Sequence, residues 1–490
     1  MPSSYDEVSW PTAIHLAGET PNAQAPGLPH MIWQVQSSNA TVIAQGDENL
    51  PYLLVNQFGK GYFIYDAAMQ PLIGHGGWAP GIYAYSIFRN AIEWAFQSAS
   101  LPIPKLSPWP YPYDAAVIFR HDFEAIPAAI NDIESSAQFE HANGASGDYF
   151  FCTGALREDM PSPEMTNTIA SLQSAVSLYG ATISPHNGGL TNINPVYNPP
   201  LVEIEPYLSQ LISEGWYTVF EPLTYPPLAP LNSNGTDYDY WHWGLDEVLD
   251  VTNLPPGFTN GAQYAFTSLS NSFSDIAGWH LTNGGPRMWV SPYFNSTREG
   301  SVQIEQELGI KVTGDDKLGP FPSWTLSTET PDLVYPLLQL PVSDWFIGSQ
   351  VAQSMENGHT AESIQALVDF YYNMGGLINL YCHSGDVNGM DGSLPSDYLT
   401  DSLSMPRIWS TNAAGIYSWW LQRSNAQVTV NYTNVGNQSV TTLSITGESN
   451  TNAAVEILAP SAFFSALQVS TNGVLAGGSV YRTNGPEIKL

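Results

Sequence analysis

The sequence predicts an α/β protein whose largest part is a distorted (β/α) barrel, and two observations support this. Short apolar runs alternate with amphipathic helical stretches from about residue 115 to residue 424, which is the pattern of a parallel sheet covered by helices. Ionisable residues also come directly after several of these runs, at the strand ends where such folds hold their active sites.

The composition limits the possible partners. The 490 residues include 13 Lys and Arg against 45 Asp and Glu, which gives a net charge of −32. We therefore expect neither nucleic acid nor an anionic membrane surface as a partner, because binding phosphates requires clustered cationic side chains. Aromatic residues make up 12% of the chain, with 15 Trp, and flat rings can stack on sugars as well as fill a core. A glycan is the partner that we expect.

The chain has features of a secreted or cell-surface protein. No apolar run in the sequence reaches the roughly 18 residues that a membrane-spanning helix needs. Acceptor motifs for N-glycosylation occur at Asn39, Asn234, Asn295, Asn431 and Asn437. No signal peptide precedes Ser3, so we expect a mature protein from which any leader has been removed.

Residues 1–108 are predicted to form a first, accessory α/β domain. Apolar runs typical of strands occur at residues 40–44, 52–56 and 62–65, and a Phe58–Gly61 turn joins the last two. Residues 83–96 carry a broad apolar helical face. This order resembles the end of a glutamine-amidotransferase-like domain. The segment contains no cysteine that could act as nucleophile, so we assign no catalysis to it.

The barrel is predicted to occupy residues 109–424, after a stiff Pro-rich linker from Leu101 to Tyr113. Strands are predicted at residues 115–120, 149–152, 181–184, 287–291, 310–313, 334–340 and 377–382. Helices are predicted at residues 125–142, 163–179, 202–213, 263–274, 298–308, 361–373 and 412–423. Because strands and helices alternate, the strands should run parallel, with their carboxyl ends at one edge.

Residues 425–490 are predicted to form a small all-β, sandwich-like domain. The runs 427–432 and 440–445 alternate between apolar and polar residues near period two, with Asn and Gly turns between them. Such a domain could cover the barrel or bind a glycan, and we favour the covering role.

The first strand of the barrel ends in a cluster of ionisable residues. The apolar residues 115–119 are followed by Arg120, His121, Asp122 and Glu124. Burying a charge is costly unless the charge is paired or holds a metal. This strand end is therefore a candidate edge of an active site, although a strand that simply reaches solvent is the plainer alternative.

Three of the ten histidines stand apart. His186 and His383 each end a predicted strand, and His242 lies between Trp241 and Trp243. Two imidazoles and one carboxylate with an open position for water make a hydrolytic metal site. A second carboxylate would accept a proton from that water, and His383 could protonate the leaving group.

In the same order, residues 112–424 resemble the polysaccharide deacetylase superfamily. Residues 120–124 are similar to the Arg-His-Asp-x-Asp variant of the first motif, and Ser184-Pro185-His186-Asn187 resembles the start of the histidine motif. Val290-Ser291-Pro292-Tyr293 is similar to the Arg-x-Pro-Tyr motif, and residues 380–383 resemble the final Leu-x-His motif. The resemblance implies a divalent metal, usually zinc, and removal of N- or O-acetyl groups from a polysaccharide.

The resemblance also implies roles for individual residues. Asp122 would be the catalytic base and His383 the acid. Glu124 and His186 would bind the metal, together with His242. In this sequence, Leu190 stands where the family has its second histidine, and His242 is proposed as its substitute.

Other residues would form the substrate side of the site. The backbone N–H of Tyr293 would help to hold the oxyanion, and Trp241, Arg120 and His121 would contact the substrate.

Two alternatives in these roles stay open. Val290 stands in place of the arginine of Arg-x-Pro-Tyr, so Arg287 or Arg120 could serve instead. In a second alignment of the first motif, His121 is the base and Asp122 binds the metal. We prefer the first alignment, because a carboxylate beside a cation is the commoner base of the family.

The preferred hypothesis is a secreted, metal-dependent polysaccharide deacetylase. A non-catalytic glycan-binding or surface-layer protein on the same barrel is the first alternative, and Leu190 favours it. A glycoside hydrolase is the second, but it needs two carboxylates roughly 5–10 Å apart on opposite sides of a sugar bond. Asp122 would then require a distant partner such as Asp316 or Glu247.

Overall fold

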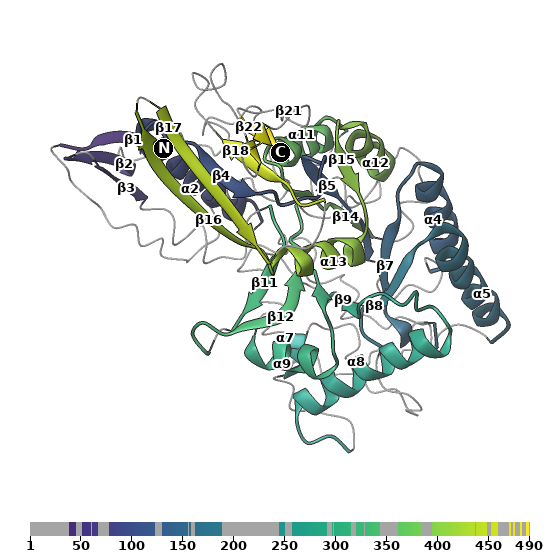
Figure 1. Ribbon diagram of the computed structural model, residues 1–490. Helices are drawn as coiled ribbons and strands as arrows, with labels where there is room; N and C mark the ends of the chain where they lie inside the picture. The colour runs from purple at the N-terminus through teal and green to yellow at the C-terminus, as the bar shows by residue number, and fades with distance from the viewer. Residues whose placement is uncertain are drawn as a thin grey trace.

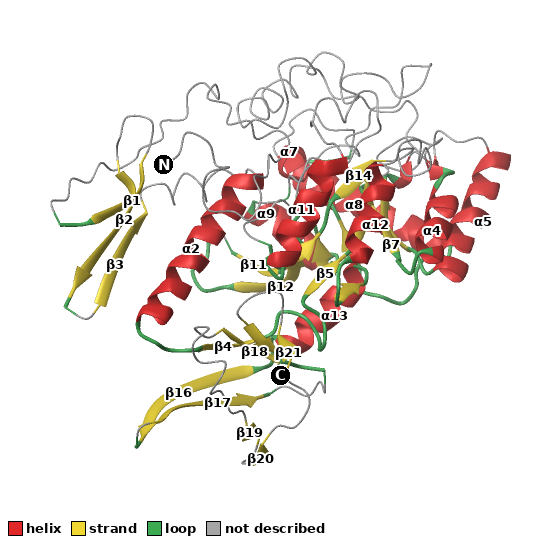
Figure 2. Cartoon of the chain, turned by 90° about the horizontal axis from the view of Figure 1, so that it is seen from above, coloured by secondary structure: helices red, strands yellow, loops and turns green. Residues whose placement is uncertain are grey.

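The computed structural model describes residues 39–45, 51–59, 61–66, 78–122, 130–154, 156–157, 162–188, 245–249, 257–291, 296, 298–314, 320–327, 329–343, 361–383, 394–436, 438–447, 452–458, 470–471, 474–475, 481–482 and 487–489. The fold is mixed α/β, as the sequence predicts (Figures 1 and 2).

The described strands are β1 (Thr41–Gln45), β2 (Pro51–Phe58), β3 (Gly61–Asp66), β4 (Ile103–Leu106), β5 (Ala115–Val117), β6 (Phe119–Asp122), β7 (Gly147–Phe151), β8 (Thr182–Pro185), β9 (Met288–Trp289), β10 (Val312–Thr313), β11 (Ser323–Leu326), β12 (Val334–Gln339), β13 (Leu377–Ile378), β14 (Tyr381–His383), β15 (Ile408–Ser410), β16 (Gln427–Val435), β17 (Gln438–Thr446), β18 (Val455–Leu458), β19 (Ser470–Thr471), β20 (Val474–Leu475), β21 (Tyr481–Arg482) and β22 (Glu487–Lys489). The described helices are α2 (Trp78–Ser98), α4 (Ile133–Ala142), α5 (Ser162–Tyr179), α7 (Leu245–Leu249), α8 (Gly261–Gly278), α9 (Glu299–Glu307), α11 (Ala361–Asn373), α12 (Leu394–Ser404) and α13 (Ala413–Arg423).

Local sequence explains where two of the helices begin. Asn260 precedes α8, and its side chain accepts a hydrogen bond from the Gln263 N–H at 2.8 Å. Asn412 caps α13 in the same way, accepting from the Gly415 N–H at 2.9 Å. Each cap satisfies a backbone donor that the first helical turn leaves without an intrahelical partner.

The main strands run parallel and place the ionisable cluster at one edge. The sheet order is β14-β6-β7-β8, and β5, the continuation of β6 before Ile118, pairs with β13 and β15. Asp122 is level with His383 on one side and with Phe150 on the other. The carboxyl ends of β14, β6, β7 and β8 therefore meet at a common edge.

A second sheet lies beside the first. Its order is β11-β12-β10-β9, with β12, β10 and β9 parallel. His186, after β8, bonds the Val290 carbonyl after β9, and the Ser343 N–H donates to the Asn379 carbonyl at 2.8 Å. Among the described strands, no ladder joins β8 to β9 or β12 to β13. The closed barrel therefore stays a prediction.

Alternation along the strands separates an interior core from the core under the helices. Ile118 and Phe150 face the interior, where they pack with Val290 and Val312. Tyr149 and its neighbours on the other face pack beneath α4 and α5, which lie side by side outside β7 (Figure 1). Successive side chains of a strand point to opposite faces, so Arg120 and Asp122 share the interior face and His121 faces outward.

The Pro-rich segment is not an isolated linker. β4, within it, pairs antiparallel with β18, so that Leu106 is opposite Val455 in the four-stranded sheet β21-β22-β18-β4. Trp109, in the same segment, is fully buried against Trp419 and other interior residues. The segment is thus part of the packed structure, held by a strand that comes about 350 residues later in the chain.

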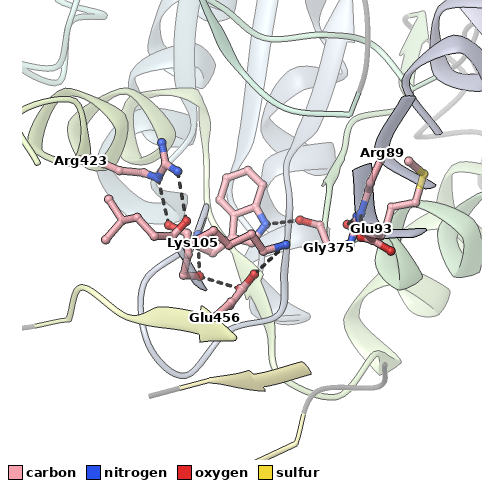
Figure 3. Close-up of polar contacts among 10 residues, drawn as sticks. Arg89, Glu93, Lys105, Gly375, Arg423 and Glu456 are labelled. Atoms are coloured by element: carbon pink, nitrogen blue, oxygen red, sulfur yellow. Dashed lines mark hydrogen bonds and ion pairs between the residues drawn. The ribbon is translucent and has the colours of Figure 1, made fainter. Parts of the chain in front are cut away.

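Polar contacts fix this junction (Figure 3). Glu456 on β18 accepts from Ser107 at 2.9 Å and pairs with Lys105 at 3.2 Å. The Trp109 ring N–H donates to the Gly375 carbonyl at 2.7 Å, and Arg423 at the end of α13 donates to the Ser107 carbonyl at 2.9 Å. These contacts tie the strand β4, the sheet containing β18 and the end of α11 together.

The flanking parts contain the predicted types of element. β1, β2 and β3 form an antiparallel sheet followed by α2, and the C-terminal part contains the β16-β17 hairpin and the sheet with β18. The amidotransferase-like character of residues 1–108 and the domain boundaries at 108 and 424 stay predictions. Of the helices in the described part of the chain, none is long and apolar enough to cross a membrane.

Candidate functional site

Arg120 and Asp122 form a buried ion pair at the carboxyl edge of the sheet. Both side chains are about 3% exposed. Arg120 Nε donates to Asp122 Oδ1 at 2.8 Å and Nη2 donates to Oδ2 at 2.6 Å. Such a bidentate pair fixes the plane of the carboxylate as well as its position. Of the two arginines that could hold Asp122, the structure brings Arg120 to it.

Arg120 is itself held from three sides. Its Nη1 donates to the Gly314 carbonyl after β10 at 2.8 Å, so its side chain spans the interior from β6 to β10. The guanidinium lies over the rings of Phe150 and Tyr381, 5.7 and 5.2 Å from their centroids. A cation over an aromatic face is attracted by the ring quadrupole. The alternative, Arg287, instead donates to the Leu308 carbonyl at 2.6 Å.

His383 and His186 end strands on either side of Asp122. The His383 backbone pairs in register with Asp122, while His186 follows β8, two strands away. Neighbouring strands lie about 4.8 Å apart, so the backbones of Asp122 and His186 are separated by roughly two strand spacings. All three residues lie at the same edge.

The His186 imidazole is oriented by its Nδ1, which lies 2.7 Å from the Val290 carbonyl. Because a carbonyl only accepts, Nδ1 carries the proton and the lone pair of the neutral ring is on Nε2. A metal-ligating histidine is commonly oriented by such a bond from its other ring nitrogen. The His186 backbone is also held, since its carbonyl accepts from the Cys152 thiol at 2.9 Å.

A second, partly buried ion pair anchors the loop that carries His186. Arg157 pairs with Asp275 on α8 and donates to the Gly188 carbonyl at 2.5 Å. Thr153 donates to the same carboxylate at 2.7 Å. Burial raises the pKa of Asp275, and Arg157 opposes that effect. A side chain on Gly188 would clash, because its Cβ would lie 2.5 Å from Thr153 Oγ1.

His121 lies on the opposite face of β6, away from Asp122. Its Nε2 is 2.5 Å from Glu140 Oε1 on α4, and its ring stacks on Tyr149 with centroids 4.5 Å apart. The Tyr149 hydroxyl donates to Glu140 Oε2 at 2.7 Å. All three side chains are buried. The structure therefore places His121 among the residues beneath α4, not beside the Arg120–Asp122 pair.

Asp148 is a buried acid on the interior face of β7, level with Arg120. Desolvation by burial raises the pKa of Asp148 to about 7, although hydrogen bonds from the Ala413 N–H and the Thr182 hydroxyl favour the charged form. Asp148 Oδ2 accepts from Ala413, the first residue of α13, at 2.7 Å. The N-terminus of a helix favours a negative charge and so lowers the pKa of a nearby acid, but the effect of burial on the pKa of Asp148 is larger.

Several predicted site residues lie outside the described part of the chain. These are Glu124, Trp241, His242, Tyr293 and, from the glycoside hydrolase alternative, Asp316. Only the backbone of His383 is described, and the same holds for Glu247. Within the described residues, no three His, Cys, Asp or Glu side chains are grouped so that they could hold a metal ion. The predicted metal set thus has one described member, His186.

The sequence interpretation missed four polar residues around this edge, of which two are buried and two partly buried. Glu140, Asp148, Arg157 and Asp275 each contact the strands or loops that carry predicted site residues. Glu140 and Asp275 lie in helices among ordinary polar positions, so only their contacts in the folded chain distinguish them. Asp148 offered a signal, because an acid at the start of the apolar run 149–152 is unusual in a buried strand.

Comparisons with known proteins found solved structures of low similarity to this chain. No protein-family profile and no curated protein matches the sequence. A family 4 carbohydrate esterase from Streptomyces lividans, solved with acetate, is 11% identical with a TM-score of 0.29, covering 61% of this chain and 92% of its own. A CE4 family pseudoenzyme from Bacillus anthracis is 10% identical with a TM-score of 0.31, covering 64% and 70%.

A Mycobacterium smegmatis protein assigned as a polysaccharide deacetylase is 12% identical with a TM-score of 0.36, covering 68% of this chain and all of its own. With TM-scores below 0.5, these similarities leave the function to be inferred from the site itself.

Proposed function

We propose that the protein is a metal-dependent carbohydrate deacetylase that hydrolyses N- or O-acetyl groups of a polysaccharide. The observation that carries the proposal is the Arg120-held carboxylate of Asp122 at the strand edge that also bears His383 and His186. These residues follow the order of the deacetylase motifs, and the oriented carboxylate suits the part of a general base.

The donor chemistry at His186 fits a divalent cation. The bond from Nδ1 to the Val290 carbonyl orients the ring and puts the lone pair on Nε2, as a ligand nitrogen requires. Glu124 and His242 are the other proposed ligands, which would complete the two-imidazole, one-carboxylate set that zinc favours. When bound, such a cation lowers the pKa of a water molecule and polarises a carbonyl group.

Other residues of the chain would transfer protons and stabilise the oxyanion. Asp122 accepts the proton of the attacking water, and Arg120 keeps the carboxylate in the geometry for that transfer. His383 donates a proton to the departing amine or hydroxyl. The Tyr293 backbone N–H stabilises the oxyanion, and the Trp241 ring forms the substrate side. His121 is left out of this set, because its side chain is buried beneath α4 on the opposite face of β6. Secretion and a glycan partner complete the proposal.

The test is acetate release from acetylated oligosaccharides by the full chain. Wild type should release acetate without shortening the sugar chain, and Asp122→Asn should lose most of that activity while binding the same amount of zinc. Shortened chains without acetate would support a glycoside hydrolase instead. Retention of full activity by Asp122→Asn would contradict the base assignment.

A non-catalytic glycan-binding role is the second candidate. It is favoured by one observation: both Asp122 oxygens are engaged by Arg120. Under this alternative, purified protein would bind acetylated oligosaccharides but contain no stoichiometric metal and release no acetate.

A further inference from the structure

The long hairpin β16-β17 has two outer edges that pair with no other described strand. Its nine cross-strand pairs run without interruption from Gln427 opposite Thr446 to Val435 opposite Gln438. Among the described strands, these two pair only with each other, and the hairpin lies at the periphery of the molecule (Figure 2). A two-stranded ribbon is only marginally stable in water, and the edge of a strand presents a row of backbone N–H and C=O groups that another strand can bind.

The hairpin lacks the features with which natural edge strands avoid pairing with another chain. Such features are charges, prolines, bulges and short length. No charged residue and no proline occurs from Ser424 to Gly447, and the pairing register contains no shift. The edge strand β1, by contrast, is five residues long and has two register shifts in its pairing with β2. The hairpin therefore keeps an edge that is suited to accept another strand.

The contacts of the hairpin with the rest of the chain indicate that β17 is its outer strand. The strand β16 lies against β4, and the Tyr432 hydroxyl on β16 donates to the Pro102 carbonyl at 2.8 Å. Thr442, at the middle of β17, is exposed. An added strand would therefore meet the backbone of β17.

The strand β17 is complementary to a second copy of itself. In an antiparallel pair about a two-fold axis at Thr442, both copies present the same edge, so their backbone donors and acceptors match by symmetry. Leu443 and Ile445 share one face of the hairpin with Val428 and Val430. The two-fold register puts the same residues of both copies on that face, which keeps the apolar side continuous. No like charges lie opposite each other, because the strand has none.

We propose that two copies of the chain associate by antiparallel pairing of their β17 edges, which gives a four-stranded sheet with its two-fold axis at Thr442. The net charge of −32 opposes the approach of two chains, and an uncharged strand is a surface on which this repulsion is small. Salt screens the repulsion, so association should strengthen with salt, whereas a contact made of ion pairs would weaken. The proposal does not depend on the deacetylase activity.

The test is sedimentation equilibrium of the full chain over a dilution series up to about 0.1 mM, where even a weak interface of small area should be occupied. We expect a mass that approaches twice 53.4 kDa at the highest concentration. The dimer fraction should be larger in about 0.5 M than in about 0.05 M sodium chloride. A monomer at every concentration, species larger than a dimer, or dissociation by salt would each overturn the proposal.

Two variants identify the edge that makes the contact. Thr442→Lys places two like charges opposite each other at the two-fold axis and should be monomeric throughout, with circular dichroism confirming that it is folded. Thr429→Lys is the matched control, since it adds the same charge at an exposed position on the same face of the hairpin, but on β16. It should dimerise like wild type. Dimers that persist in Thr442→Lys, or that are lost equally in both variants, would overturn pairing through β17.

Discussion

Arg120 donates a hydrogen bond to each carboxylate oxygen of Asp122, with Nε 2.8 Å from Oδ1 and Nη2 2.6 Å from Oδ2. The two residues lie two positions apart on β6, so their side chains share the interior face. Arg120 also reaches the Gly314 carbonyl, which fixes the far end of its side chain. The direction of the Asp122 carboxylate is therefore set by one arginine that bridges two strands.

Replacing Arg120 by lysine tests this arrangement. Arg120→Lys keeps the charge but loses the planar fork that engages both oxygens. We expect acetate release to fall by roughly 10²-fold or more, because small displacements of a reacting group cost about this much. Steady-state kinetics would measure the rate of acetate release, and thermal unfolding would show whether the variant is folded.

Arg287→Lys is the matched control, since Arg287 contacts the Leu308 carbonyl and the Phe273 ring and not Asp122. It should retain near wild-type kinetics. Equal losses in the two variants would contradict a specific role for Arg120.

Asp148 should make stability depend on pH. Burial raises its pKa from 3.8 to about 7, so the folded state favours the protonated form. The stability linked to this group is complete below pH 3.8 and is lost as the pH rises to about 7. Asp148→Asn removes this dependence. Relative to the variant, wild type should lose on the order of 4 kcal/mol of unfolding free energy between pH 4 and pH 7.

Urea unfolding of both proteins at pH 4, 5.5, 7 and 8 measures the difference, because the carboxylates common to both proteins cancel. A difference that stays constant over this range would show that Asp148 titrates near its ordinary value.

Gly147 keeps space for the buried His121–Glu140–Tyr149 network. A Cβ at this position would lie 2.2 Å from Glu140 Oε2 and 2.8 Å from a Tyr149 ring carbon. Gly147→Ala should therefore destabilise the protein by about 1–3 kcal/mol, as overpacking of a core does. Gly278→Ala is the matched control, since a Cβ there meets nothing within 4 Å at the end of α8. Thermal unfolding should show a lower midpoint in Gly147→Ala alone.

Arg157 should act on metal binding through the loop that carries His186. Arg157→Met removes the bond to the Gly188 carbonyl and the pair with Asp275. Loss of such supporting contacts typically weakens metal binding about 10–100-fold, and we expect a loss in that range when zinc is titrated against a competing chelator. Arg298→Met, at an exposed arginine that bonds the Asp246 carbonyl, should bind zinc like wild type. Equal zinc affinities in all three proteins would exclude this role.

Elements whose pattern is local could be predicted from the sequence. Apolar residues at helical spacing marked α5, α8, α9 and α11, with no end more than four residues from the observed one. The strands that carry Asp122, His186 and His383 were also predicted, and parallel pairing alone brings their ends to one edge. The helix α12 and the strand β15 were missed.

Features created by distant contacts could not be predicted. β4 exists because Leu106 pairs with Val455, a partner that no local pattern in a Pro-rich segment indicates. The Arg157–Asp275 pair joins residues 118 positions apart. Alternation along a strand puts Arg120 and Asp122 on one face and His121 on the other, but only the positions of α4 and Glu140 show what the His121 side chain contacts.

The most direct test of the proposed function is the metal content of purified wild-type protein beside His186→Ala, measured by inductively coupled plasma mass spectrometry after exchange into zinc buffer. We expect close to one zinc per wild-type chain and almost none in His186→Ala, with thermal unfolding confirming that the variant is folded. Equal zinc in both proteins, or none in wild type, would contradict a metal site built on His186.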